Sequence, residues 1–218
     1  METLIKDQIA AHGYAFIPNR YVGRDIVAVA AALGRPLTPW KDGLVQELVP
    51  RTSAPPNTYS GIYGLSGFPF HTDLAHWRLP PRYLLLWCIK GYTDVPTLLI
   101  DGHTFVEGEL RDILTRAIFK SRRPLDGAIK LLRLCEATDD GYRLRWDEVF
   151  LRPASKVGEL ADQRIRKHLV HSNPISIPLA HPGDTLLIDN WRMLHARTPI
   201  NADRLDRKIE RIYLEGLN

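Results

Sequence analysis

Short strand-like segments separated by turn signals are the feature that most limits how this chain can fold. Each segment is a run of roughly four to eight apolar or alternating residues, the length of a typical strand. The predicted strands are residues 14–17, 45–49, 59–63, 83–89, 96–100, 129–134, 142–146, 175–179, 185–188 and 209–214. Residues 139–141 and 181–184 are predicted turns because they combine Asp with Gly or Pro. So many short strands predict a mainly β fold, and a double-stranded β-helix (a cupin-like jelly roll) fits this number of strands.

Four segments are predicted to form helices that flank the sheet. These helices are expected over residues 2–12, 24–33, 105–119 and 158–170. Gly13 and Gly34 stand where the first two should end, and Thr104 can cap the start of the third. Within the third, apolar residues recur at helical spacing. The helices argue against a pure β-sandwich.

The composition is that of an ordinary globular protein and predicts a single domain over residues 1–218. The 218 residues are 44% hydrophobic and 25% charged, which suffices for a substantial core. The sequence has no apolar run of membrane-spanning length, and its first residues lack the basic and apolar pattern of a secretory signal. We therefore expect a cytoplasmic protein.

Cysteine usage and charge narrow the expected chemistry further. Cys88 and Cys135 lie in apolar surroundings and are predicted to be buried free thiols, with a disulfide between them as the alternative. The net charge of +4 is modest, although arginines gather toward the C-terminal end. Carboxylates are interleaved with these arginines and no nucleic-acid-binding motif accompanies them. We therefore expect some arginines to face an anionic small molecule rather than nucleic acid.

One stretch, residues 68–77, contains a His-x-Asp pair formed by His71 and Asp73. In an extended chain, side chains two residues apart point to the same face, so this imidazole and carboxylate can hold one divalent metal. A distant second histidine would complete a facial triad, which leaves coordination positions open. His195 can supply it, since the predicted strand at 185–188 delivers it to the end of an element. The alternatives are an ordinary polar pair at a strand end and a partly buried, hydrogen-bonded histidine.

Four motifs in this chain resemble those of the Fe(II)/2-oxoglutarate-dependent oxygenases related to taurine dioxygenase and clavaminate synthase. The motifs are Phe70-His71-Thr72-Asp73, Pro96-Thr97, Asp189-Asn190-Trp191-Arg192-Met193-Leu194-His195 and Arg207-Lys208-Ile209-Glu210-Arg211. They occur in the family's order and near the family's spacing. The resemblance extends over residues 57–214, which is most of the chain.

The resemblance implies a role for each matching residue. Fe(II) would be bound by three ligands, namely His71, Asp73 and His195. Thr97 and Arg207 would hold a carboxylate of the co-substrate 2-oxoglutarate. A guanidinium suits this task because its fork of donors matches a carboxylate and stays charged at any working pH. Arg211 would also reach 2-oxoglutarate or bind an anionic group on the primary substrate, while a solvated basic edge is the alternative for both arginines.

The activity implied by the resemblance couples oxidative decarboxylation of 2-oxoglutarate to oxidation of a second substrate by dioxygen. We expect hydroxylation or desaturation of a small polar metabolite, such as an amino acid or a biosynthetic intermediate. An intact Asp73 supports this, because halogenating members of the family have a small residue at that position. Two alternatives stay open: a cupin-like metalloenzyme that does not use 2-oxoglutarate, and a non-catalytic metal-dependent binding or sensing module. No membrane partner is expected, and a homo-oligomer is compatible with the sequence.

The chain is short for this family, whose members usually carry longer insertions over the substrate. Residues 37–66 are where a lid would lie. The candidate pocket walls are Tyr59, Tyr63, Phe68, Trp146 and Arg152. Packing in the core, or a plain strand and turn, explains each of them equally well. A short lid predicts an open pocket, a pocket completed by a partner subunit, or a macromolecule-linked substrate.

Overall fold

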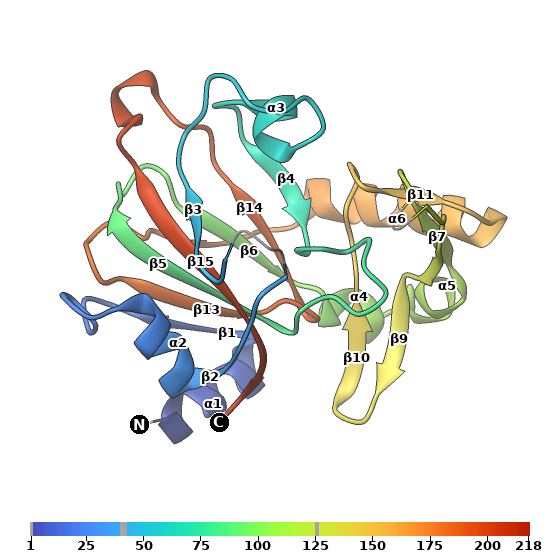
Figure 1. Ribbon diagram of the computed structural model, residues 1–218. Coiled ribbons are helices and arrows are strands. Elements are labelled where there is room, and N and C mark those ends of the chain that lie inside the picture. The colour runs from blue at the N-terminus through green and yellow to red at the C-terminus, as the bar shows by residue number, and fades with distance from the viewer. Residues whose placement is uncertain (1, 40–42, 125–126) are drawn as a thin grey trace.

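Two antiparallel β-sheets face each other and form the body of the protein (Figure 1). The computed structural model describes residues 2–39, 43–124 and 127–218. The larger sheet has six strands in the order β1 (Tyr14–Ile17), β13 (Thr185–Asp189), β5 (Tyr83–Lys90), β15 (Lys208–Leu217) and β2 (Gly34–Leu37), with β3 (Gln46–Leu48) also paired to β15. The smaller sheet has the order β12 (Ile175–Ile177), β6 (Thr97–Asp101), β14 (Met193–Arg197) and β4 (Phe68–His71). The predicted fold class, mainly β with flanking helices, is confirmed.

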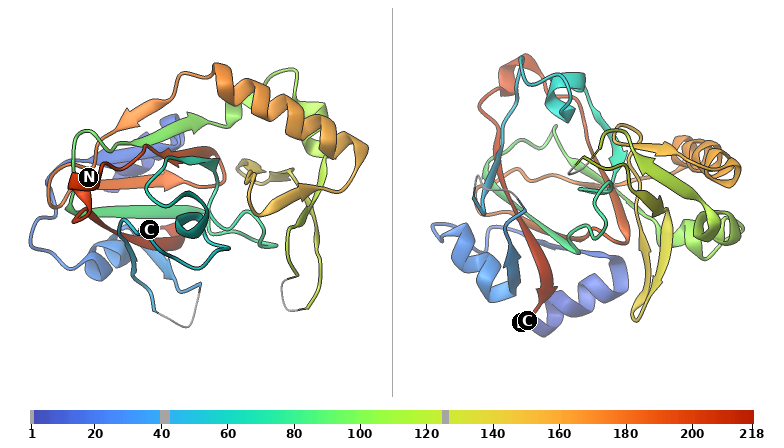
Figure 2. Two further views of the ribbon diagram at one scale, coloured as in Figure 1. Left: turned by 90° about the horizontal axis from the view of Figure 1, so that it is seen from above. Right: turned by 45° about the vertical axis from the view of Figure 1, so that its right-hand side comes forward.

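Helices cover the outer face of the six-stranded sheet, and a lateral layer lies beside the two sheets (Figure 2). The helices on the six-stranded sheet are α1 (Glu2–His12) and α2 (Ile26–Leu33). The lateral layer contains α4 (His103–Val106), α5 (Arg111–Arg116), α6 (Lys156–His171), β7 (Ile118–Ser121), β8 (Leu131–Arg133), β9 (Cys135–Thr138), β10 (Gly141–Leu144) and β11 (Leu151–Pro153). Among the helices of the described residues, none combines the length and apolar character needed to cross a bilayer.

Strand β5 shows how one apolar run serves two cores. Leu84 and Leu86 pack in the core between the two sheets, whereas Leu85 and Trp87 pack in the core beneath α1 and α2. Successive side chains of a strand point to opposite faces, and here both faces are covered. The strand therefore needs no polar face, which explains why its sequence is a continuous apolar run.

The two cysteines lie in different cores. Cys88 belongs to the core between the sheets and Cys135 to the core of the lateral layer, and both are buried free thiols. Burial raises the pKa of each thiol to about 11, so neither forms much thiolate at neutral pH. The predicted pair of buried free thiols is confirmed.

The strand predicted over residues 59–63 is instead the short helix α3 (Tyr59–Tyr63). The side chain of Thr58 caps this helix by accepting a hydrogen bond from the N–H of Gly61 at 3.1 Å. Gly61 also lies against the carbonyl group of Pro55, where a Cβ would meet the oxygen at 1.9 Å. The cap and this close approach outweigh the β propensity of the two tyrosines.

The single helix predicted over residues 105–119 is two short helices followed by a strand. Helix α4 begins at His103, whose N–H donates to the carboxylate of Asp101 at 2.9 Å, so Asp101 rather than Thr104 supplies the first acceptor. Gly108 separates α4 from α5. The residues after α5 enter β7, which pairs with β8 on one side and β11 on the other. Pairing at both edges outweighs the helical pattern of this segment.

The turn predicted at residues 139–141 is confirmed, but the strand that precedes it is β9 rather than residues 129–134. Thr138 pairs with Gly141 across a two-residue turn, which fixes the partner of β10 as the residues immediately before the turn. Residues 129–134 contribute β8, which pairs with β7.

The sequence predicts His195 at the end of an element, and this prediction is wrong. His195 is the middle residue of β14. Strand β13 ends at Asp189, whose carboxylate accepts a hydrogen bond from the N–H of Trp191 at 2.9 Å. There the chain turns from the larger sheet into the smaller one. Only three residues separate β13 from β14, so the sequence gives no clear signal that a second strand begins.

Replacing Leu85 with Ala tests the role assigned to β5. Leu85 is fully buried in the six-stranded sheet, so the change should lower the free energy of unfolding by about 2–5 kcal/mol, as cavity-forming substitutions do. Urea denaturation followed by circular dichroism measures this. Leu131→Ala is the matched control, because Leu131 is 69% exposed and its loss should cost less than about 0.5 kcal/mol. Equal losses for the two variants would contradict the assignment.

Candidate metal centre and active-site cavity

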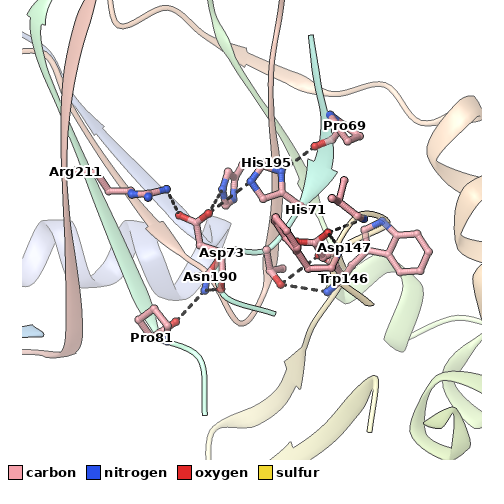
Figure 3. A network of polar contacts seen from close by, with 12 residues as sticks. Pro69, His71, Asp73, Pro81, Trp146, Asp147, Asn190, His195 and Arg211 are labelled. Atoms are coloured by element: carbon pink, nitrogen blue, oxygen red, sulfur yellow. Dashed lines mark hydrogen bonds and ion pairs between the residues drawn. The ribbon is translucent and has the colours of Figure 1, made fainter. Parts of the chain in front are cut away.

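His71, Asp73 and His195 meet at one point on the smaller sheet (Figure 3). His71 is the last residue of β4 and pairs directly across from His195 on β14. Asp73 follows in the loop after β4, and its Oδ1 lies 3.5 Å from His71 Nε2 and 3.6 Å from His195 Nε2. All three residues are buried. The predicted ligand set is therefore brought together from two remote parts of the chain.

Hydrogen bonding fixes which nitrogen of His71 faces this point. The Nδ1 atom of His71 lies 2.8 Å from the carbonyl oxygen of Pro69, so the imidazole proton is placed on Nδ1. In the neutral imidazole, Nε2 then carries no proton and is directed toward Asp73. An imidazole in this state has a lone pair that a metal ion can accept.

The two oxygens of Asp73 have separate partners. Oδ1 faces the two imidazoles, whereas Oδ2 accepts hydrogen bonds from the guanidinium of Arg211 at 2.9 Å and from the hydroxyl of Tyr213 at 3.0 Å. Burial alone would raise the pKa of Asp73, but the Arg211 guanidinium and the two histidines outweigh it and hold that pKa well below its usual value. Asp73 is thus a carboxylate that presents one oxygen to the centre.

The distances from Asp73 to the two histidines are those expected for one divalent transition-metal ion bound between these side chains. Two atoms that each lie about 2.1 Å from an ion are at most about 4.2 Å apart, and both distances from Asp73 Oδ1 to the imidazole nitrogens satisfy this limit. Two imidazoles and one carboxylate form the donor set of the facial triad, which leaves positions open for other ligands.

Asn190 joins the two halves of this centre. It is fully buried at the turn between β13 and β14, five residues before His195. Its Oδ1 accepts from the N–H of Asp73 at 2.7 Å, and its Nδ2 donates to the carbonyls of Asp73 at 3.0 Å and Pro81 at 2.9 Å (Figure 3). The segment that carries His195 therefore holds the backbone of Asp73.

A buried arginine fixes the loop that follows Asp73. Arg145 donates to the carbonyl oxygens of Ala75 at 3.0 Å and Trp77 at 2.5 Å, and it pairs with Glu136 at 3.1 Å. The side chain of Arg145 is 1% exposed. Because these carbonyl groups lie where regular structure is absent, the guanidinium supplies the donors that they need.

A cavity of about 620 Å³ opens beside His71, Asp73 and His195. Tyr59 and Phe68 line it, as the sequence predicts, and the ring of Tyr59 stacks on His71 with 4.4 Å between ring centroids. Tyr63 does not line the cavity in the described part of the chain, although its ring packs against that of Tyr59. The short helix α3 thus brings one aromatic ring directly against a candidate ligand.

Thr97 and Arg207 both line this cavity. Thr97 is the first residue of β6, and Arg207 directly precedes β15. The side chain of Arg207 is buried, and its Nε has no hydrogen-bond partner among the described residues. Burial lowers the pKa of Arg207 to about 10, so the guanidinium is still charged at neutral pH. A buried cation without a partner suits the carboxylate of 2-oxoglutarate.

Arg211 lines the same cavity, but its donors point to protein groups. One contacts Asp73, and two others contact Oε1 of Gln46 at 2.9 Å and 2.6 Å. The bond to Asp73 makes Arg211 a partner of the candidate metal ligand. Its expected contact with 2-oxoglutarate or with a substrate anion stays a prediction.

Sequence reasoning missed Asp147, which lines the cavity near His71. Its Oδ1 accepts hydrogen bonds from the N–H groups of Val149 at 2.7 Å and Phe150 at 2.8 Å, and burial raises the pKa of its carboxyl group. The sequence singled out Trp146 and Arg152 in this segment, yet neither lines the cavity among the described residues, and Trp146 lies in the lateral core. The sequence offered one signal for Asp147, namely an acidic residue between a predicted strand and a turn.

The chain is similar to known proteins in sequence and in fold. No family model matches the sequence. The chain is similar to clavaminate synthase 2 of Streptomyces clavuligerus, with 29% identity over 163 residues, which is 66% of this chain and 49% of that protein. The chain thus spans about half the length of the curated relative that it matches.

Two solved structures have the same fold. Asparagine oxygenase in complex with Fe(II), 2S,3S-3-hydroxyasparagine and succinate matches with a TM-score of 0.72 and 20% identity, over 98% of this chain and 79% of that chain. The non-haem iron oxygenase OrfP in complex with Fe and alpha-ketoglutaric acid matches with a TM-score of 0.76 and 21% identity, over 98% of this chain and 78% of that chain. The predicted jelly roll and the predicted resemblance to clavaminate synthase and its relatives are confirmed.

Replacing Asn190 with Ala should weaken metal binding, because Asp73 would lose the contacts that hold its backbone. Loss of such an outer partner typically costs about 10- to 100-fold in metal affinity. Titration with Co²⁺ under anaerobic conditions, followed by visible absorption, measures the affinity. Asn218→Ala is the control, since Asn218 also donates to two carbonyls, of Ala31 and Ala32, but at α2. Unchanged Co²⁺ affinity in Asn190→Ala would show that Asn190 does not position the ligand.

Proposed function

We propose that this protein is an Fe(II)/2-oxoglutarate-dependent oxygenase. The observation that carries the proposal is the convergence of His71, Asp73 and His195 beside a cavity that also contains the cation of Arg207, which has no acidic partner among the described residues. Bound Fe(II) would couple the decarboxylation of 2-oxoglutarate, to succinate and carbon dioxide, to the oxidation of a substrate by dioxygen. The names of clavaminate synthase 2, asparagine oxygenase and OrfP support this proposal.

Different residues of this chain would bind the metal and the co-substrate. His71, Asp73 and His195 would hold the metal, while Arg207 would fork its donors onto a carboxylate of 2-oxoglutarate, with Thr97 beside it. The ring of Tyr59, stacked on His71, restricts the orientation of that imidazole and keeps water from one side of the centre. These groups orient the reactants and do not themselves exchange protons with them.

The cavity favours an amino acid as the primary substrate. Asp147 adds a buried carboxylate to a cavity wall that contains several arginines and two other acidic residues, Glu47 and Asp73. A substrate with an ammonium or guanidinium group would supply the cation that this carboxylate needs. Asparagine oxygenase and the hydroxyarginine complex of OrfP indicate amino-acid substrates among proteins of this fold. We infer that Asp147 pairs with the cationic group of the substrate.

Three smaller predictions accompany this proposal. Residues 1–218 would form one domain, the protein would act in the cytoplasm, and its oligomeric state would be either monomeric or homo-oligomeric. Sedimentation of the purified chain at several concentrations distinguishes a monomer from a homo-oligomer.

Anaerobic titration of the protein with Fe(II) and then 2-oxoglutarate tests the proposed function. The chelate should produce a weak visible charge-transfer band, and Arg207→Met should weaken 2-oxoglutarate binding by about 10- to 100-fold, because hydrogen bonds to charged groups contribute this much. Arg204→Met is the control, since Arg204 pairs with Asp94 and Asp203 and does not line the cavity. Binding of Fe(II) without any band would favour a metalloenzyme that does not use 2-oxoglutarate.

Succinate release during an amino-acid screen tests the role of Asp147. Asp147→Asn keeps an oxygen for the N–H groups of Val149 and Phe150 but removes the charge. For the best substrate, kcat/KM should fall by at least about 10-fold, because a buried cation would lose its partner. Asp112→Asn, at an exposed position of α5, should change nothing. Succinate release that no amino acid stimulates would exclude this substrate class, and absence of succinate altogether would favour the non-catalytic alternative.

A further inference from the structure

Two arginines, the buried Arg207 and the half-buried Arg197, line the cavity without an acidic partner among the described residues. Neither forms an ion pair with any described residue, and the Nε atom of each is buried without a hydrogen-bond partner among those residues. Leaving a buried cation unpaired is costly, and placing a second cation nearby adds to the cost. The pair therefore indicates that an anion belongs between or beside them.

Both guanidinium groups are charged under physiological conditions. Burial, together with the positive charge of Arg207, lowers the pKa of Arg197 to about 10, and burial lowers the pKa of Arg207 to about the same value. These values are still well above neutral pH. Two positive charges thus face the region where 2-oxoglutarate is proposed to bind.

The place of Arg197 in the smaller sheet puts it next to the other residues of this region. Arg197 ends β14, two residues after His195, so the two side chains share a face of the sheet. Its neighbour on β6 is Thr97, and its neighbour on β4 is Phe68. The guanidinium carbon lies 3.7 Å from the ring centroid of Phe68, which restricts its position.

Arg197 also reaches the segment that follows α3. One terminal nitrogen, Nη2, donates to the carbonyl oxygens of Gly64 at 3.0 Å and Ser66 at 2.6 Å. Helix α3 ends at Tyr63 and begins with Tyr59, whose ring stacks on His71. Arg197 therefore connects the cavity to the helix that supplies the aromatic wall of the metal centre.

We propose that Arg197 is a second cationic ligand for the carboxylate of the co-substrate, and that its bonds to residues 64 and 66 couple co-substrate binding to the position of α3. This inference rests on the proposed 2-oxoglutarate dependence. The carboxylate would bind the Nε side of Arg197 together with Arg207, while the Nη2 atom keeps its bonds to the loop. Binding of the anion would then hold Tyr59 more firmly against His71.

A purely structural role for Arg197 is the competing explanation, because its bonds to two carbonyls would be useful without any ligand. The two explanations differ in what 2-oxoglutarate changes. If Arg197 has only a structural role, it stabilises the folded protein equally with and without the co-substrate. A ligand that also holds α3 alters co-substrate affinity, and it makes the protection of residues 59–66 depend on the co-substrate.

The test measures 2-oxoglutarate affinity and amide hydrogen exchange in the full chain loaded with Co²⁺. In the wild type, 2-oxoglutarate should slow exchange in peptides covering residues 59–66. Arg197→Gln should weaken 2-oxoglutarate binding by at least about 10-fold and abolish this slowing, while Co²⁺ affinity stays unchanged. Arg197→Lys keeps the charge but lacks the fork, so it should also weaken binding, and it replaces the Gln variant if that variant loses Co²⁺ binding. Arg204→Gln is the control for both measurements.

Each outcome decides between the explanations. If wild-type protein binds Co²⁺ but not 2-oxoglutarate, the proposed function fails and this inference fails with it. If the wild type binds 2-oxoglutarate and both Arg197 variants bind it equally well, the proposed function stands and Arg197 has only a structural role. If affinity falls but exchange in residues 59–66 does not respond to 2-oxoglutarate in the wild type, Arg197 is a ligand without coupling to α3, and the second half of the inference is overturned.

Discussion

The carboxylate of Asp73 is the group on which the rest of the site depends. One oxygen faces two imidazoles, and the other accepts hydrogen bonds from Arg211 and Tyr213. A buried carboxylate needs such partners, because burial otherwise drives it toward its neutral form. The arrangement keeps Asp73 ionised and leaves only Oδ1 facing the imidazoles. Open coordination positions, and hence the proposed chemistry, follow from that restriction.

The jelly roll supplies this geometry by joining distant parts of the chain. Paired strands β4 and β14 set His71 opposite His195, and the turn between β13 and β14 carries Asn190 to the backbone of Asp73. Strand β14 is anchored on both of its faces, because Met193 packs in the core between the two sheets and Leu194 packs in the lateral core. Strands hold His71 and His195, and the loop after β4 holds Asp73, whereas α3 and the loop after it form a separate wall. This division explains why a contact such as that of Arg197 can join a fixed centre to a more peripheral element.

Much of this structure could be predicted from sequence, and the failures share a physical cause. The spacing of His71 and Asp73, the apolar run of β5 and the turn before β13 are local patterns, so they were readable. Tyr59–Tyr63 and residues 105–119 were misassigned because a cap, a close glycine contact and strand pairing outweighed propensity. Asn190, Asp147 and Arg197 were missed because their roles depend on tertiary contacts that no spacing encodes. Thr97 and Arg207 were found only through resemblance, and their contacts with 2-oxoglutarate stay predictions.

A crystal structure of the Co²⁺-loaded protein, with anomalous scattering recorded at the cobalt edge, tests the central claim most directly. We expect one strong anomalous peak within about 2.0–2.2 Å of Asp73 Oδ1 and of the Nε2 atoms of both histidines. We also expect that Oδ2 of Asp73 still accepts from Arg211. A peak bound elsewhere on the chain, or an ion held by both oxygens of Asp73 after Arg211 has moved away, would contradict the central claim.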